Sequence, residues 1–407
     1  METWKKNLYA IWLAEFLAVV GFSTSYPIVP FYLQDLGVTD PVRLKFWVGL
    51  CTTGGALTMA VFAPIWGKLS DSYGRKLMLL RALFGGCVAI VLMGFIRHPV
   101  ELFILRVIQG MLSGTVAAAT ILVATTAPGD KVGYALGLLH MAIFIGASVG
   151  PMAGGIIADM FGYRVTFFIT AGFLALAGTV VTAFVHENFV PVPVKGGILK
   201  AIIPDFSPLR KSRELLVLVV SAGFVQAANQ VSTPTLPLFV QSLDASNTLV
   251  ASTTGVILGA AALSSALAAA LIGKASFRIG YRRTLLLCLL GAGCFVVPQA
   301  FSTTPVFLLV FRVLGGICIG GTMPSINAMI AIRTDQDKRG SIYGISSSFN
   351  AGGSALGPAI GSIIAVAFGY AATFLGTALI FCLCCAVVLI FTRTRGGSVS
   401  SPAATGM

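Results

Sequence analysis

Charged side chains are scarce in this sequence: Asp, Glu, Lys and Arg together make up 10% of its 407 residues. A soluble domain of ordinary composition carries about a quarter of charged residues. Hydrophobic residues make up 57% of the chain, and the mean hydropathy is +0.93. A chain with so little charge cannot cover a water-exposed surface. The composition therefore excludes an ordinary soluble protein and predicts residence in a lipid bilayer.

Residues for metal or nucleophilic chemistry are also sparse. The three histidines, His98, His140 and His186, are scattered, and the eight cysteines fall inside apolar stretches without the spacing of metal ligands. We interpret the cysteines as small apolar packing residues. The sequence shows neither a phosphate-binding loop nor a nucleophile elbow. These observations argue against an enzyme and predict no metal and no bound cofactor.

Long apolar stretches recur along the whole chain, and each is long enough to cross about 30 Å of hydrocarbon. Only helices fit, because the stretches are too continuous for barrel strands and each must satisfy its own backbone. The sequence predicts an all-α integral membrane protein with twelve spans, at about 8–33, 46–66, 77–96, 101–123, 133–158, 164–186, 213–238, 251–272, 284–301, 306–328, 341–366 and 371–391.

The distribution of basic residues predicts the orientation. With a cytoplasmic N-terminus, the outward loops contain Arg43, Lys45, Arg97 and Arg164, whereas most of the 27 basic residues lie in cytoplasmic loops and tails. This bias predicts that both termini are cytoplasmic. It also accounts for the net charge of +13 without a nucleic-acid site. We interpret the first stretch as a retained span and not as a cleaved signal peptide.

The two halves of the chain repeat each other at an offset of about 206 residues. Segment 27–36, PIVPFYLQDL, matches 234–243, PTLPLFVQSL, and Arg106 matches Arg312. Because the matches follow the same order in both halves, we predict two pseudo-symmetric six-helix bundles with a site between them, as in alternating-access transporters. The predicted parts are an N-terminal bundle, a cytoplasmic linker, a C-terminal bundle and a short cytoplasmic tail, at 1–190, 191–212, 213–392 and 393–407.

Three motifs carry a resemblance to a known family: GKLSDSYGRK at 67–76, RVIQG at 106–110 and GASVGPMAGG at 146–155. With them the chain resembles the major facilitator superfamily, in its twelve-span drug:proton antiporter group, and is similar to bacterial multidrug transporters of the MdtG type. The resemblance implies a monomer in the bacterial inner membrane. It also implies that the proton gradient drives export of small amphipathic compounds.

Glu15 is the one acidic residue deep inside a predicted span. A charge at that depth is costly, so it is a functional hypothesis by default. Glu15 shares a helical face with Phe22 and Tyr26, which predicts a carboxylate beneath two aromatic rings, suited to an apolar cation. Gln109 of span four is predicted to line the substrate cavity with Phe22 and Tyr26. Arg106 lies near Gln109, although the estimated depths disfavour a direct bridge between Arg106 and Glu15. We predict that Glu15 and Arg106 take part in proton coupling.

The loop at 67–76 predicts a conformational latch. Gly67 and Gly74 allow tight turns. In the resembling family, the acid that corresponds to Asp71, beside Arg75, contacts the N-terminal end of span eleven, where the helix dipole attracts negative charge. Such a contact would hold the halves together on the cytoplasmic side. The second copy of the loop has Phe277 instead of the acid and predicts no equivalent latch.

Small residues repeat at helical spacing in spans five and eleven. They predict close helix packing, with a proline that can kink each span. In the resembling fold, span five packs on span eight and span two on span eleven, so we expect these stripes to form the surface along which the halves rock. The residues are Gly146, Gly150, Pro151, Gly154, Gly353, Gly357 and Pro358.

Span seven has neutral polar residues where span one has Glu15 and the aromatic rings. Gln226, Asn229 and Thr233 share one face, and they predict a hydrogen-bonding wall of the substrate cavity. The alternatives are polar contacts between helices for this wall, and for the whole protein an exporter of an amphiphilic lipid or sugar, an uncoupled facilitator, or a membrane receptor without transport.

Overall fold

The computed structural model describes residues 2–129, 131–187, 189, 212–244, 248–334 and 339–392, without the side chains of residues 68, 71 and 339–341. The described residues form helices, and twelve of the helical segments are long and apolar enough to cross a membrane. This confirms the predicted fold class. The predicted linker at 191–212, except Ser212, and the predicted tail at 393–407 lie outside the described residues.

The twelve spans divide between the two halves of the chain, and several are built from two helices in series. The first half consists of α1 (Thr3–Thr24) with α2 (Val29–Asp35), α3 (Pro41–Tyr73), α4 (Arg75–Phe95), α5 (Pro99–Leu112) with α6 (Thr115–Thr126), α7 (Val132–Phe161) and α8 (Tyr163–Phe184). The second half consists of α11 (Arg213–Val231) with α12 (Leu236–Leu243), α13 (Val250–Ile279), α14 (Tyr281–Val296) with the 3-10 helix η1 (Val297–Phe301), α15 (Pro305–Gly320) with α16 (Thr322–Arg333), α17 (Arg339–Phe368) and α18 (Tyr370–Phe391). The repeat is visible here, because spans one and seven, and spans four and ten, are interrupted at matching places.

Local sequence signals explain where several helices begin. Asp40 precedes Pro41, and its carboxylate accepts a hydrogen bond from the Arg43 backbone N–H at 2.7 Å. Ser212 and Thr304 cap α11 and α15 in the same way. Such caps satisfy backbone donors that a helix start leaves open. Gly74, with a φ of 100°, turns the chain between α3 and α4, in a conformation that favours glycine.

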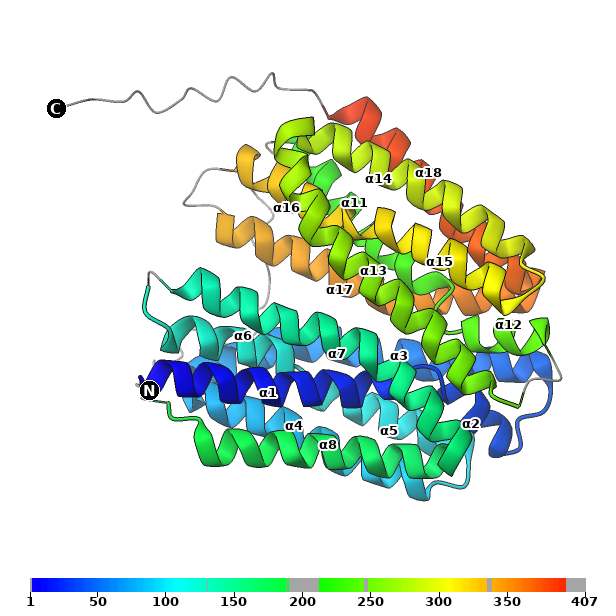
Figure 1. Cartoon of the computed structure of the whole chain (residues 1–407), viewed down its shortest axis with the longest axis horizontal. Coiled ribbons are helices and arrows are strands. Elements are labelled where there is room, and N and C mark those ends of the chain that lie inside the picture. The colour runs from blue at the N-terminus through cyan, green and yellow to red at the C-terminus, as the bar shows by residue number, and fades with distance from the viewer. Residues whose placement is uncertain are drawn as a thin grey trace.

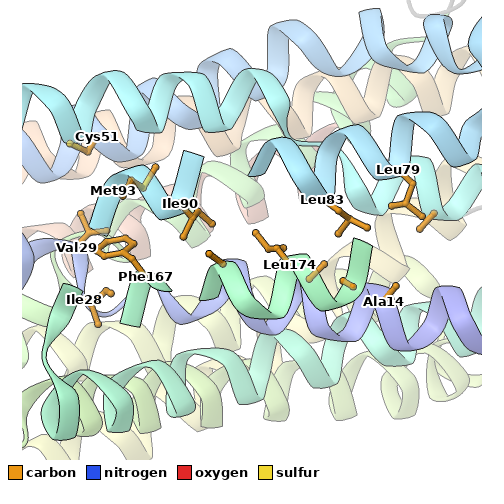
Figure 2. Close-up of a cluster of buried hydrophobic side chains, with 14 of the residues drawn as sticks. Ala14, Ile28, Val29, Cys51, Leu79, Leu83, Ile90, Met93, Phe167 and Leu174 are labelled. Atoms are coloured by element: carbon orange, nitrogen blue, oxygen red, sulfur yellow. The ribbon is translucent and has the colours of Figure 1, made fainter. Parts of the chain in front are cut away.

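Each half has its own apolar core. In the first half, Leu79, Leu83 and Ile90 of α4 meet Leu174 and Phe167 of α8, and Figure 2 shows these side chains gathered between the helices. A separate cluster fills the second half. Most of each core lies within one half, and the first core reaches Leu238 of α12 and Ala251 of α13, where the halves meet.

The two halves meet mainly through α7 against α13 and α3 against α17. We call the end of the molecule that carries α2 and α12 the α2 face, and the opposite end, where α1 begins, the N-terminal face. In Figure 1 the halves converge at the α2 face and diverge toward the N-terminal face. Cβ atoms placed on Gly133 of α7 and Gly273 of α13, near the N-terminal face, meet nothing within 4 Å. The contacts between the halves thus gather toward the α2 face, and α7 and α13 lie apart toward the N-terminal face.

The glycine stripes do not form the surface between the halves, which corrects the sequence-based expectation. A Cβ at Gly150 would lie 2.6 Å from Cβ of Ser23, and Gly146 and Gly154 likewise face α1 of the same half. Gly353 and Gly357 face α11 in the second half. The stripes therefore pack span five on span one, and span eleven on span seven.

The prolines of these spans lie on the opposite side. A Cβ at Gly255 of α13 would collide with the carbonyl of Pro151, and one at Gly49 of α3 would lie 3.8 Å from the carbonyl of Pro358. Span five does pack on span eight and span two on span eleven, as expected. The predicted helix pairs are therefore correct, but the predicted contact faces of α7 and α17 are wrong. Small residues lie on two faces of such a helix, and the sequence pattern does not show which face meets the other half.

Candidate functional site

A cavity of about 320 Å³ lies within the second half, and the predicted polar wall of span seven lines it. Gln226 and Asn229 of α11 and Thr233, just beyond its end, all contribute, together with residues of α13, α14, η1, α15 and α18. The Gln226 amide also donates to Ser354 Oγ of α17 at 2.9 Å. The cavity volume is at the lower end for small-molecule sites. The structure therefore brings the three predicted residues together beside a hollow.

Arg312 lines the same cavity. The sequence had suggested only that it repeats Arg106, so this position was missed as a site residue. Its guanidinium Nη1 donates to Ser232 Oγ at 3.1 Å and to Gln299 Oε1 at 3.3 Å. The signal that could have found it is the absence of Asp and Glu from residue 245 to residue 334, which leaves an intramembrane cation without an acidic neighbour in its own spans.

Glu15 lies inside the first half, with 1% of its surface exposed. Its Oε1 accepts a hydrogen bond from Thr115 Oγ1 at 3.1 Å, and its Oε2 is buried without a described partner. Thr115 is the first residue of α6, which follows a break in span four at Gly114, where φ is 124°. The carboxylate thus faces the start of a helix, where the dipole favours negative charge.

The aromatic face predicted beside Glu15 is divided in the structure. The Phe22 ring approaches Gly86 of α4, to within 3.1 Å of a Cβ placed there, and so packs inside the first half. Tyr26 is 52% exposed. A buried Glu15, a Phe22 packed against α4 and an open Tyr26 do not make one surface in this conformation, which corrects the prediction of a shared cation site.

Arg106 and Glu15 bond to different partners. Arg106 Nη1 donates to Gln109 Oε1 at 3.1 Å, one helical turn along α5. This agrees with the depth estimate that disfavoured a direct bridge. The structure therefore leaves Glu15 with a neutral donor from α6, and the coupling role predicted for Arg106 stays a prediction.

The segment 67–76, predicted as a loop, is the end of α3 and the start of α4 joined at Gly74, and it is tied to its own half. The backbone N–H groups of Arg75 and Lys76 donate to the Glu187 carboxylate, at 3.0 and 2.8 Å, so that Glu187 caps α4 from the end of α8. Gly67 lies inside α3, which runs to Tyr73, so Gly74 makes the turn and the turn predicted at Gly67 is wrong. The side chain of Asp71 lies outside the described part of the chain, as do those near the start of α17, and the latch stays a prediction.

Polar contacts across the α2 face were missed by the sequence reasoning. The Asp159 carboxylate of α7 accepts from the backbone N–H of Ser252, in the first turn of α13, at 2.7 Å. The Lys45 ammonium of α3 donates to the carbonyl of Ala365 in α17 at 3.0 Å. The Asp159 carboxylate thus lies at the positive N-terminal end of α13, and the Lys45 ammonium lies near the negative C-terminal end of α17.

A third contact joins repeat-equivalent residues. Gln34 and Gln241 occupy the same place in the two copies of the repeat, and their side-chain amides hydrogen-bond each other at 3.0 and 3.4 Å. Together with Asp159 and Lys45 they hold this face closed. We call these contacts the α2-face clamp.

The comparison with known proteins identifies the family. The model of the Major Facilitator Superfamily matches the chain in two overlapping stretches, at residues 11–253 and 218–406, which together cover both halves. The chain belongs to the major facilitator superfamily. Major facilitator proteins are transporters, and accordingly this chain is a multi-pass membrane transporter and not an enzyme.

Multidrug transporters of this superfamily are similar along nearly the whole chain. The multidrug resistance protein MdtG of Proteus mirabilis (strain HI4320) is 36% identical over 378 residues, which cover 93% of each chain. MdtG of Rahnella sp. (strain Y9602) is 34% identical over 377 residues, which cover 93% of this chain and 91% of that one. The recognised resemblance to MdtG-type transporters is confirmed.

Solved structures with the same fold are more distant in sequence. The nucleoside transporter NupG superimposes with a TM-score of 0.78 at 15% identity, covering 96% of this chain and 99% of that one. A bacterial homologue of the human lysosomal transporter Spinster gives 0.79 at 12% identity, covering 97% and 98%. These likenesses establish the fold alone.

Proposed function

We propose that the protein is a proton-coupled exporter of small amphipathic compounds, and that Glu15 exchanges the proton. The observation that carries the proposal is the environment of this carboxylate. It is 1% exposed, its one hydrogen-bond donor among the described residues is neutral, and one of its oxygens has no described partner. The similarity to MdtG multidrug transporters supports the class of substrate.

The broken span four explains how such a carboxylate can change its charge. Burial away from water disfavours the ionised form, whereas the start of α6 at Thr115 stabilises it. These opposing effects keep both forms accessible, as an exchange site requires. A fully buried carboxylate without such a helix end would stay neutral, and one beside a cation would stay charged.

Orientation completes the proposed cycle. The distribution of basic residues supports a cytoplasmic N-terminal face, so that the conformation is open to the cytoplasm and closed to the outside by the α2-face clamp. Substrate enters from the cytoplasm or the inner leaflet and meets the cavity while Glu15 releases its proton inward. The halves then rock, the α2 face opens, and a proton from outside resets the carrier.

The test is transport of ethidium by purified protein in liposomes with an acidic interior. An antiporter should drive ethidium uptake above its external concentration as protons leave. Glu15→Gln keeps the side-chain size and removes the titration, so this variant should equilibrate ethidium without accumulating it. Glu2→Gln changes an exposed acid that bonds Trp4 and Lys5 and should behave as the unmodified protein.

Two results would contradict the proposal. Accumulation by Glu15→Gln equal to that of the unmodified protein would exclude Glu15 as the exchange group. Equilibration without accumulation by the unmodified protein would show an uncoupled facilitator, one of the alternatives left open by the sequence.

A further inference from the structure

The positive charge of Arg312 is not neutralised by the protein groups that hold it. Its described hydrogen bonds go to a serine hydroxyl and a glutamine amide, both neutral. The chain contains no Asp or Glu from residue 245 to residue 334, a range that includes all of α13, α14, α15 and α16. A cation kept inside a membrane span without a counter-ion costs stability and indicates a functional site.

The surrounding groups fix the guanidinium in place. The Gln299 amide Nε2 donates to the carbonyls of Phe295 and Phe311 at 3.0 and 3.1 Å, so its Oε1 must face Arg312. Gln299 and Ser232 are each 1% exposed. A guanidinium has five N–H donors in a planar fork, and the described bonds use Nη1 alone. The Nε and Nη2 donors are left for an acceptor in the cavity.

The remainder of the cavity suits a small amphiphile. Around Arg312 it is lined by polar groups such as Asn229 and Thr233, whose partners include no charged residue. The Asn229 side-chain oxygen is buried without a described hydrogen-bond partner. Small apolar side chains, among them Ala261 and Ala262 of α13, also line the cavity. The hollow thus combines a cationic, hydrogen-bonding group with apolar surface.

We propose that this cavity binds the acidic head group of an amphiphilic substrate, a carboxylate or phosphate, through the fork of Arg312. Planar oxyanions accept two parallel N–H bonds from a guanidinium, and such charge-assisted bonds are among the strong ones. The apolar tail lies along the alanines of α13. The inference rests on the proposed function, because it names a substrate class for the same transporter, and it places substrate charge in the half that lacks Glu15.

Binding to the purified protein in phosphatidylcholine nanodiscs tests the inference. The probes are 11-(dansylamino)undecanoic acid and its methyl ester, which differ only in the charge of the head group. The unmodified protein should bind the acid more tightly than the ester. Arg312→Gln should weaken binding of the acid about tenfold or more and leave the ester within about twofold. Arg312→Lys should keep the preference for the acid in weaker form, because the charge remains and the fork is lost.

Controls separate the site from general effects. Arg282→Gln removes an arginine that bonds Leu389 and Thr392 at the end of the second half and should leave both affinities unchanged. Decanoate and phosphatidylglycerol serve as competitors for the bound probe. Displacement by decanoate assigns the site to soluble amphiphiles, and displacement by phosphatidylglycerol assigns it to a lipid head group.

Two outcomes would overturn the inference. Equal affinity of the unmodified protein for acid and ester would show that Arg312 does not recognise charge. Equal weakening of both probes by Arg312→Gln, together with loss of the preference in Arg312→Lys, would show that Arg312 only supports packing. Because no proton gradient is present in nanodiscs, failure of proton coupling would leave these measurements unaffected.

Discussion

Removing the Asp159 carboxylate should shift the protein from the conformation closed at the α2 face toward the one closed at the N-terminal face. Asp159 accepts from the Ser252 N–H at 2.7 Å across the two halves. A hydrogen bond to a charged group contributes about 1.5–3 kcal/mol. We take the lower end because Asp159 is only partly buried. About 1.4 kcal/mol corresponds to a factor of ten, so Asp159→Ala should change the ratio of the two conformations about tenfold.

Paired spin labels at the N-terminal face would measure this shift. Gly133 of α7 and Gly273 of α13 suit the labels, since a Cβ atom added there meets nothing within 4 Å. The eight cysteines are first replaced by alanine. Electron–electron distance distributions should move toward shorter separations in Asp159→Ala. Asp159→Asn, which keeps an acceptor oxygen but loses the charge, should give an intermediate distribution.

Asp40→Ala provides the matched control. Asp40 accepts from the Arg43 N–H, also at 2.7 Å, but this cap lies within one half. Its loss should lower thermal stability without changing the distances between halves. If Asp159→Ala gives the distribution of the unmodified protein, or if Asp40→Ala shifts it equally, the clamp does not set the conformational balance.

Other predictions concern packing and the environment of Glu15. Gly150→Leu should lower the stability of the first half by about 1–3 kcal/mol through overpacking against α1, measured by thermal unfolding in detergent. Gly155 faces Ala251 of the other half. Gly155→Leu should therefore leave the thermal stability unchanged and prevent closure of the α2 face. An unchanged distance between the spin labels would refute this. Thr115→Val should reduce proton-driven ethidium accumulation by removing the donor to Glu15. Thr120→Val, whose hydroxyl bonds a carbonyl of its own helix, should not, and equal activity of both variants would show that the Thr115 bond is irrelevant to coupling.

The sequence was sufficient for the architecture because hydropathy and repetition act over long stretches. Apolar segments predict spans through the thickness of the bilayer, and the offset between Arg106 and Arg312 reveals the duplication. The cavity wall at Asn229 was also predictable, since a polar residue on an apolar helix must face something other than lipid. These inferences need only the properties of one helix at a time.

The predictions that were wrong or missing concern which face each helix turns toward its neighbours. Gly150 and Pro151 are neighbours in the chain, yet one faces α1 and the other faces α13. The Thr115 donor to Glu15 lies 100 residues away in the sequence, and the Asp159 contact ends on a backbone N–H, which carries no signature of its own. Pairings of this kind appear only when the helices are placed in space.

The packing of Gly146, Gly150 and Gly154 against α1 means that spans one and five move as one rigid unit. Glu15 lies on span one and Asp159 on span five, so a change of charge at Glu15 can reach Asp159 without a series of intermediate side-chain movements. These glycines tolerate little substitution, because any side chain there would push the two spans apart. The wall of the cavity in the second half is free of that constraint. Substrate range can therefore diversify by substitution at positions such as Thr233 while the moving parts stay the same.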